Sequence, residues 1–444
     1  MIEEGTSWVW LLHHGRRRVW PGAATFMLVL IAMAYSFWWG PLVRHASEWV
    51  VPGDVWSTFR AAHWIGWGDL GGVYGSDTAL VTFPGIAVLL APLAMISGSL
   101  GLSESISPIF LAHPTAWYVL GPVVLLLGST CLFALDAVAE QLGVSGRRRA
   151  VLCWFEVIVV FQVVALWGHP EDLLAFALAL YALMAGSQKR FSLSAWLWGA
   201  AIVVQPLVIL VFPLALARTQ RGRRIRLVAL AAVPSIVLVG TPLVSQWRVT
   251  SRAILRQPNY EYLDHATPWV ALSPHLSRVS VGAGPGRMAA VLVAVLFGVA
   301  AARRPPAPAG FIWLCAFALA IRCLFEAVMV PFYLGPPLAL IILAASLRAE
   351  RWRMVAAWIV AMVATVFAFH RFSEWLYWTP IAALLVIALA TAWPGWAAFC
   401  CPDGALTNHR IRLGIDPSVT PRGPLPDAAN LSPDALPTSV RTRS

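Results

Sequence analysis

Charged residues are scarce in this sequence. Only 12% of the 444 residues are Asp, Glu, Lys or Arg, whereas 59% are hydrophobic. A soluble domain usually carries about 25% charged residues, so these side chains cannot cover the surface of a water-soluble globule of this length. The composition excludes a cytosolic enzyme, a disulfide-stabilised scaffold and a disordered chain. It predicts an integral membrane protein, whose apolar runs are too long and too aliphatic for barrel strands.

Lysine is nearly absent, and the cysteines form no metal-binding pattern. Lys189 is the single lysine, and the other 31 basic residues are arginines that stand in short clusters between apolar runs. Such clusters orient membrane helices, so the net charge of +11 does not predict nucleic-acid binding. The six cysteines have no metal-ligand spacing. Four lie inside apolar runs and two follow the last run, and we expect packing roles for them.

The apolar runs predict an all-α polytopic membrane protein with about ten spanning helices. These spans are expected at residues 22–42, 114–140, 150–167, 171–187, 227–245, 286–302, 310–329, 331–347, 354–370 and 376–398. Together with two short hairpins they form the predicted bundle.

The hairpins are predicted at two further apolar stretches, 82–112 and 191–217. Lys189 precedes the second stretch and Arg218 follows it, and a single crossing would place one of these basic groups outside the cytoplasm. Pro206 near the centre removes a helical hydrogen bond, which favours two half-helices that return to one face. The first stretch is a hairpin by the same logic, because the loops on both sides of it must be external.

With these hairpins, the topology places both termini in the cytoplasm. The chain then divides into a cytosolic lead-in (1–21), a membrane domain (22–398) and a disordered cytosolic tail (399–444) rich in Pro, Ser, Thr and Arg. Two long external loops, 41–81 and 245–285, carry aromatic, acidic, basic and histidine residues. Loops that served only to connect helices would not need these residues.

Asp54 is the first candidate for chemistry. It follows a Pro-Gly turn and precedes an amphipathic stretch with Trp56, His63 and Trp67, which is suited to lie at the membrane surface. A carboxylate there could deprotonate an acceptor hydroxyl while the lipid tail of a substrate stays in the bilayer. The alternative is that Asp54 caps the following helix, which is the common role of this residue type.

The order of residues in this loop resembles the GT-C superfamily of glycosyltransferases. An acid after the first span, an alanine pair, G-x-x-x-x-V-Y and T-F-P occur in turn: Asp54, Ala61 with Ala62, Gly68, Val73 with Tyr74, and Phe83 with Pro84. The likeness is narrower to the bacterial polyprenyl-phosphate-mannose-dependent branch. The resemblance implies that Asp54 is the catalytic base, that the donor is a lipid-linked sugar, and that the anomeric carbon is inverted.

A second cluster comprises His169, Glu171 and Asp172, between two predicted spans on the external side. A helix N-terminus after Pro170 explains the two acids but not the histidine. In families related by the resemblance, a polar motif in this loop faces the active site and in some supplies metal ligands. Contiguity is a weak sign of a metal site. We predict sugar or acceptor binding, assign no metal ligand and leave a divalent cation open.

A third cluster comprises Arg322 and Glu326, which lie four residues apart in an apolar run and therefore on one helix face. Buried charges line a cavity or meet a partner, so a structural ion pair and a donor-phosphate site at Arg322 are both open. The segment resembles the late-helix pattern of the same family, which makes Tyr333 its tyrosine. In the second long loop, Arg256 or His265 could assist at the donor phosphate, although an ordinary interfacial loop explains most residues there.

These observations predict an integral-membrane glycosyltransferase. It would move a sugar, with mannose preferred, from a polyprenyl-monophosphate donor to a glycolipid or cell-wall glycan at the extracytoplasmic face of the plasma membrane. Membrane lipids are expected partners and nucleic acid is not. The alternative is a transporter or flippase of a lipid-linked sugar, which explains the buried charges but not the acid-bearing first loop.

Overall fold

The computed structural model describes residues 18–43, 48–75, 80, 82–104, 113–260, 265–370 and 372–400. Most of the predicted lead-in and nearly all of the predicted tail lie outside the described residues. The described chain is mainly helical, and its helices are α2 (Val19–Val43), α3 (Val55–Gly66), α4 (Gly85–Ser99), α5 (Trp117–Gln141), α6 (Gly146–Val160), α7 (Pro170–Ser187), α8 (Phe191–Val204), α9 (Phe212–Arg218), α10 (Arg224–Ser245), α11 (Trp247–Arg256), α12 (Pro285–Arg303), α13 (Pro308–Phe325), α14 (Gly335–Ser346), α15 (Arg351–Phe367), α16 (Glu374–Thr391) and α17 (Ala397–Cys400).

Eight helices among the described residues are long and apolar enough to cross a membrane, which confirms a largely α-helical membrane protein. They are α2, α5, α6 with its π-helical extension η3 (Phe161–Trp167), α7, α10, α12, α13 and α16. The helices at the predicted spans 331–347 and 354–370 are shorter, since α14 has 12 residues and α15 has 17. The count of ten spans therefore stays a prediction.

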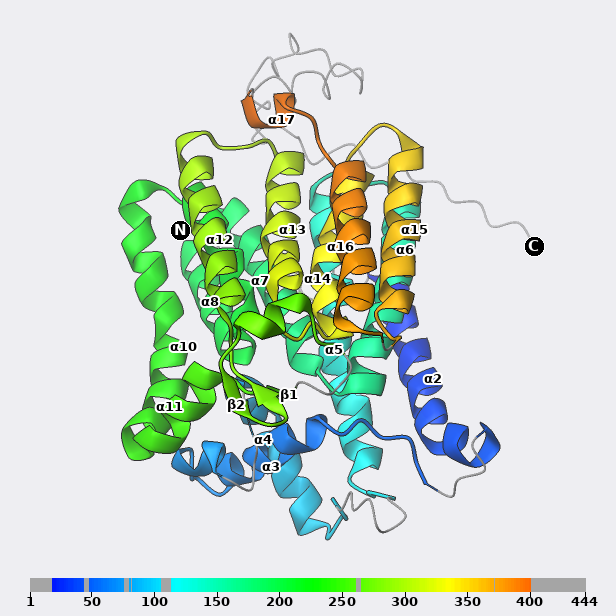
Figure 1. The fold of residues 1–444 in the computed structure, drawn as a ribbon, viewed down its shortest axis with the longest axis vertical. Helices are drawn as coiled ribbons and strands as arrows, with labels where there is room; N and C mark the ends of the chain where they lie inside the picture. Colours follow the sequence, from blue (N-terminus) through cyan, green and yellow to red (C-terminus); the bar gives the residue numbers. More distant parts are fainter. Residues whose placement is uncertain are drawn as a thin grey trace, which may run out of the picture.

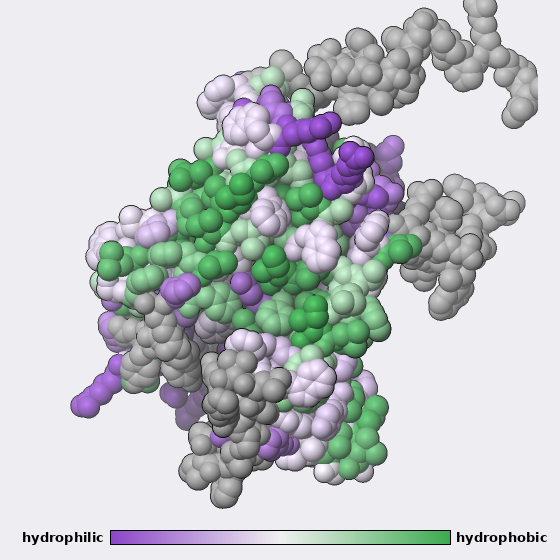
Figure 2. Space-filling model, turned by 90° about the vertical axis from the view of Figure 1, so that its right-hand side faces the viewer, coloured by the Kyte–Doolittle hydropathy of each residue, from purple (hydrophilic) through white to green (hydrophobic). Residues whose placement is uncertain are grey.

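The helices differ in how much of their surface is buried, as a bundle in lipid requires. In the most apolar 18-residue stretch of each helix, 17% of the residues are buried in α10 and 67% in α7. Every residue of α14 is buried. Figure 1 accordingly shows α7, α13 and α14 at the centre, with α10 and α2 at opposite edges. On one side of the molecule, green hydrophobic side chains predominate in the middle and purple hydrophilic ones gather near the upper end (Figure 2).

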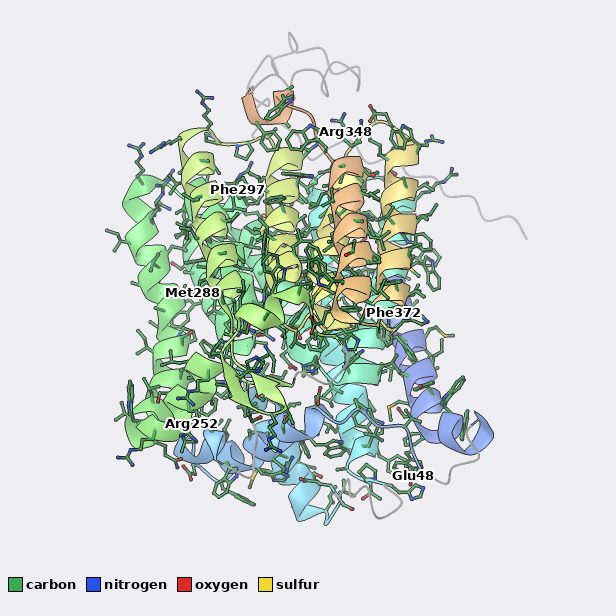
Figure 3. The ribbon with its side chains drawn as sticks, in the orientation of Figure 1. Glu48, Arg252, Met288, Phe297, Arg348 and Phe372 are labelled. Atoms are coloured by element: carbon green, nitrogen blue, oxygen red, sulfur yellow. The ribbon has the colours of Figure 1, made fainter. Side chains whose placement is uncertain are left out.

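One end of the bundle, which we call the arginine-rich face, carries Arg18, Arg148, Arg218 and Arg348. Arg148 donates to the carbonyl oxygens of Ser346 and Arg348, and Arg348 donates to that of Pro394. Figure 3 places Arg348 at this upper end and Arg252 and Glu48 at the opposite end. The basic groups thus close the loops between helices on one face, as the charge pattern predicts.

The predicted hairpin at 191–217 is present. Helix α8 ends at an extended Gln205, a 3-10 turn η4 (Pro206–Leu210) follows, and α9 is a separate short helix. Arg218 at the end of α9 donates to the Pro306 carbonyl at 2.7 Å, and the Arg223 guanidinium lies 4.3 Å from the Phe191 ring centroid. Both ends of the hairpin therefore lie at the arginine-rich face.

The stretch 82–112 is described only in its first part. The described part contains one helix, α4, which packs along α3. Residues 105–112 lie outside the described residues, so the hairpin over 82–112 stays a prediction. A Cβ on Gly85 at the start of α4 would lie 2.6 Å from the Val203 carbonyl oxygen. Helix α4 therefore begins against the broken end of α8.

The two long loops contain more regular structure than expected. The first holds α3 and the 3-10 turn η2 (Gly71–Tyr74), and the second holds α11 and a three-stranded antiparallel sheet. The sheet has the order β1 (Asn259–Tyr260), β3 (Ser280–Val281) and β2 (His275–Ser277), with a bulge in β2. Figure 1 shows these elements together at the end opposite the arginine-rich face. The sheet departs from a strictly all-α fold.

A four-residue network fixes the start of α2 against α5 and α6. Arg18 contacts both Asp136 and Glu140, and Arg149 reaches the same two carboxylates at 3.2 and 3.1 Å. The side chains of Arg18 and Asp136 are 3% and 9% exposed. Because a buried charge without a partner is costly, each member depends on the others.

We expect Asp136→Asn to destabilise the protein by about 2 kcal/mol, because Glu140 alone then remains for two arginines. Thermal unfolding in detergent measures the effect, and Arg147→Gln, an exposed change in the same arginine cluster, is the control. Equal midpoints for the two variants would show that the network contributes nothing to stability.

Candidate functional site

Several helices end inside the molecule, and buried polar side chains gather at these ends. Helix α6 with η3 ends at Gly168, α8 ends at Gln205, and α13 ends at Glu326. A helix end leaves backbone groups without intrahelical partners, and in an apolar interior these must be satisfied by side chains or by a cavity. The ends bring the second and third predicted clusters into one region.

The first arrangement joins the first loop to the α6–α7 connection. Nε2 of His169 lies 3.0 Å from Oδ2 of Asp54, and its Nδ1 lies 2.7 Å from Oε1 of Glu171. Gly168 has a φ of +81°, and a Cβ there would lie 2.9 Å from the Val55 backbone nitrogen. A glycine in the left-handed region thus lets the two loops approach closely enough for the histidine to meet Asp54.

Asp54 is not used as a helix cap. It stands at the N-terminus of α3, but its side chain makes no capping hydrogen bond, and its side chain is 59% exposed. The capping alternative is therefore not supported by the geometry. The carboxylate is oriented by His169 and keeps an open side toward solvent, which is what a base that meets a substrate hydroxyl requires.

The imidazole of His169 is held between two acids. Burial of the ring opposes protonation, but the charges and hydrogen bonds of Glu171 and Asp54 outweigh it and raise the pKa of His169 well above its usual value. The ring also stacks on Phe332, with centroids 4.0 Å apart. The histidine is thus a fixed, positively charged partner for Asp54.

Asp172 lies beside this arrangement and is 2% exposed. Its Oδ1 accepts a hydrogen bond from the Gln205 side chain at 3.0 Å, whereas Oδ2 of Asp172 and Oε2 of Glu171 are buried without a partner among the described residues. The ligand atoms of His169, Glu171 and Asp172 lie within 4.8 Å of one another. Carboxylates and imidazole suit a divalent cation, but both ring nitrogens of His169 already contact carboxylates, so a cation would have to displace one contact.

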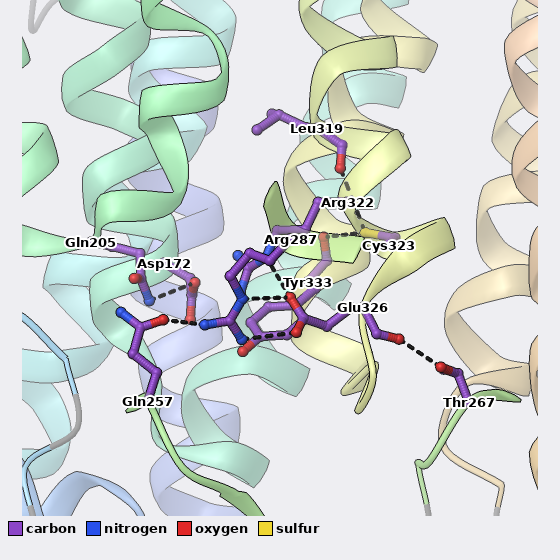
Figure 4. A network of polar contacts seen from close by, with 10 residues as sticks. All are labelled: Asp172, Gln205, Gln257, Thr267, Arg287, Leu319, Arg322, Cys323, Glu326 and Tyr333. Atoms are coloured by element: carbon purple, nitrogen blue, oxygen red, sulfur yellow. Dashed lines mark hydrogen bonds and ion pairs between the residues drawn. The ribbon is translucent and has the colours of Figure 1, made fainter. Parts of the chain in front are cut away.

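The second arrangement is a pair of arginines on one buried carboxylate (Figure 4). Glu326, 1% exposed, accepts from Arg322 Nε at 2.9 Å and from Arg287 Nε and a terminal nitrogen at 3.1 and 2.8 Å. Arg287 also donates to the Gln257 side chain, and the Arg322 guanidinium lies 4.2 Å from the Tyr333 ring centroid. Among the described residues, no hydrogen bond occupies the two terminal nitrogens of Arg322.

A cavity of about 200 Å³ opens beside the two arginines. Its polar lining includes Thr82, Gln205, Gln257, Arg287, Arg322 and Tyr333. The turn η7 (Pro331–Leu334) connects the two arrangements, because Phe332 stacks on His169 and the next residue, Tyr333, lies under Arg322. Asp172 interacts electrostatically with both His169 and Arg322. The acidic and the basic group of side chains are therefore neighbours, and none of the acids is among the described residues that line the cavity.

The other predicted residues lie elsewhere. Tyr74 is 3% exposed and donates to the Thr82 carbonyl at 2.9 Å, so it packs the loop. His265 is 1% exposed, with Nε2 3.2 Å from the Ala368 carbonyl oxygen, and Arg256 is exposed at the end of α11. None of these three residues is among the described residues that line the cavity.

Arg287 was missed from the sequence. It stands at the start of an apolar run, where arginine usually serves as an orientation signal. A signal was present, however, because the topology places this run's start on the external side, where a basic residue is unexpected.

None of the protein-family models, curated proteins or solved structures compared with this chain matches it. The likeness to GT-C enzymes therefore stays an expectation based on the first-loop motif, and the function has to be inferred from the geometry of the site.

The raised pKa of His169 predicts a pH-dependent contribution to stability. Its ion pairs with Asp54 and Glu171 are fully present below about pH 6.5, the pKa of a free histidine, and are lost as the pH rises through the higher pKa in the folded state. We expect the thermal midpoint of wild type to be higher than that of His169→Gln. The difference should be largest at about pH 6 and should shrink progressively toward about pH 10. The exposed His370 supplies the control, His370→Gln. A difference that stays constant with pH would contradict a charged His169.

Proposed function

We propose that this protein is a membrane glycosyltransferase that moves a sugar, with mannose preferred, from a polyprenyl-monophosphate donor to a glycolipid or glycan acceptor. The observation that carries the proposal is an exposed carboxylate, Asp54, oriented by His169. The ring of His169 stacks on Phe332, and the next residue, Tyr333, lies under Arg322 at the cavity that the partly buried Arg287 also lines. A base for the acceptor and cations for the donor phosphate are the two elements that this reaction needs. The reaction is proposed for the extracytoplasmic face of the plasma membrane.

In the proposed reaction, Asp54 removes the proton of the attacking hydroxyl. The acceptor oxygen forms a bond to the anomeric carbon, the bond from that carbon to the phosphate oxygen breaks, and the proton goes to Asp54. The electron pair of the broken bond leaves with the polyprenyl phosphate. Because the acceptor attacks from the face opposite this bond in a single displacement, the anomeric carbon is inverted. Glu171 supports His169, and His169 fixes Asp54, which keeps the carboxylate in one orientation before the acceptor arrives.

The cavity beside Arg322 and Arg287 is proposed to hold the donor phosphate. Guanidinium groups suit phosphate oxygens because they donate two parallel hydrogen bonds. Arg322 contacts Glu326 through Nε, which leaves its terminal nitrogens available to the cavity. Glu326 and the Tyr333 ring hold the guanidinium in place, so little side-chain ordering is needed when the donor binds.

We expect Asp54→Asn to lower transfer about 10²- to 10⁴-fold, because the amide cannot accept the hydroxyl proton. Purified protein reconstituted in lipid vesicles, polyprenyl-phosphate [¹⁴C]mannose and total lipid acceptors provide the assay. Asp69→Asn is the matched control in the same loop, because Asp69 accepts a hydrogen bond from the Gly72 backbone at 2.9 Å that asparagine can also accept. Full activity of Asp54→Asn would overturn the assignment, and label that only crosses vesicle membranes would favour the flippase.

We expect Arg322→Gln to lower transfer about 10²-fold or more, because one cation at the leaving phosphate is lost. Glu326 keeps Arg287 as its partner, so the fold should survive, which the thermal midpoint checks. Arg256→Gln is the control, since Arg256 lies outside the cavity. If Arg256→Gln is the more damaging change, the donor phosphate binds at the second loop instead.

A further inference from the structure

A second pocket, remote from the proposed active site, opens between the starts of α8 and α10. It has a volume of about 500 Å³ and is lined by Lys189, Arg190, Arg223 and Arg226 together with Phe191 and Ser192. No carboxylate is among the lining residues that the structure describes. The pocket therefore carries a concentrated positive charge at the arginine-rich face.

Two basic residues of this pocket, Lys189 and Arg226, make fewer contacts than the neighbouring arginines. Arg224 donates to the carbonyl oxygens of Thr219 and Ala217, and Arg218 donates to that of Pro306. In contrast, within the described chain no side-chain hydrogen bond or ion pair engages Lys189 or Arg226. The neighbours close turns of the backbone, whereas these two cations remain available to a ligand.

Lys189 is also held in an unfavourable backbone conformation. Its φ is +62°, and its backbone nitrogen donates to the Gly186 carbonyl at 3.0 Å at the end of α7. Glycine is the usual residue at such a position, because a Cβ is disfavoured there. The single lysine of the chain thus stands where a small residue would be more stable, and residues in this kind of strain cluster at ligand sites.

The same backbone feature occurs at the central cavity. Gln257, with a φ of +35°, is the other non-glycine residue with positive φ among those described. It lines the central cavity and contacts Arg287. Both residues of this kind therefore lie at a cavity with basic side chains.

The position of the pocket indicates the chemistry of its ligand. Helix α10 lies at the outer edge of the bundle (Figure 1) and is mostly exposed, so the pocket opens beside the lipid at the level where the helices begin. Leu227 and Leu230 line it one and two turns into α10. The ligand should therefore have an anionic head for the basic residues and an apolar tail that continues along α10.

We propose that this pocket binds the headgroup of an anionic membrane phospholipid. Lys189 and Arg226 contact its phosphate, and Arg223, which stacks on Phe191 with 4.3 Å between guanidinium carbon and ring centroid, borders the headgroup. Basic pockets between helices at a membrane surface bind such lipids by charge. The proposal is independent of the proposed sugar transfer.

Native mass spectrometry of the full-length protein from nanodiscs tests it. The discs contain phosphatidylcholine with graded amounts of phosphatidylglycerol, and the retained lipids are counted. We expect wild type to retain phosphatidylglycerol selectively. The double variant Lys189→Gly/Arg226→Gln should bind it about 25-fold more weakly, or about fivefold for each charge removed. The control is Arg303→Gln/Arg304→Gln, which removes two exposed arginines on the same face outside the pocket.

The single variant Lys189→Gly separates binding from folding. Glycine relieves the strained backbone, so the thermal midpoint should stay equal or rise while phosphatidylglycerol binding falls about fivefold. Equal losses in the double variant and the control would overturn the proposal, because the charge of the whole face would then be responsible. Retention of both lipids alike by wild type, or displacement of the lipid by equimolar glycerol phosphate, would also overturn it.

Discussion

The centre of this protein depends on the ion pairs that the carboxylate of Glu326 makes with two arginines. This carboxylate lies at the end of α13, and its two oxygens bind arginines from α12 and from α13 itself. The carbonyl groups at the same helix end are satisfied from outside: that of Leu324 accepts from the indole nitrogens of Trp269 and Trp378, and that of Glu326 from Thr267. A helix can end inside an apolar bundle only if its exposed backbone groups find such partners. The second loop is therefore ordered against the broken helix.

The same constraint explains why the site forms where it does. The helix ends at Gly168, Gln205 and Glu326 lie in one region, and each allows polar side chains into an otherwise apolar interior. The acidic arrangement is attached to the α6–α7 connection and the basic arrangement to α12 and α13. The turn η7 fixes their relation, because neighbouring aromatic residues contact one member of each. Helix breaks, which would be costly without polar partners, thus create a place inside the bundle where opposite charges lie near each other.

The sequence predicts features that depend on local spacing and fails for those that depend on distant packing. Arg322 and Glu326 are four residues apart on one helix, so their pairing follows from helical geometry. The hairpin at 191–217 follows from charge placement and Pro206. The contact of Asp54 with His169, 115 residues away, depends on how two loops pack at Gly168, which no periodicity encodes. The short sheet was missed because its strands have two or three residues, too few for an alternating pattern.

Charge balance in the cavity bears on how the proposed reaction would be favoured. Two arginines on one carboxylate leave a net charge of +1, which matches the single negative charge of a phosphodiester-linked sugar donor. When the bond to the sugar breaks, the phosphate becomes a monoester that approaches a charge of −2, since its second pKa is about 6. The arginines then attract the leaving group more strongly than the donor, and an interaction that strengthens toward the transition state accelerates the step.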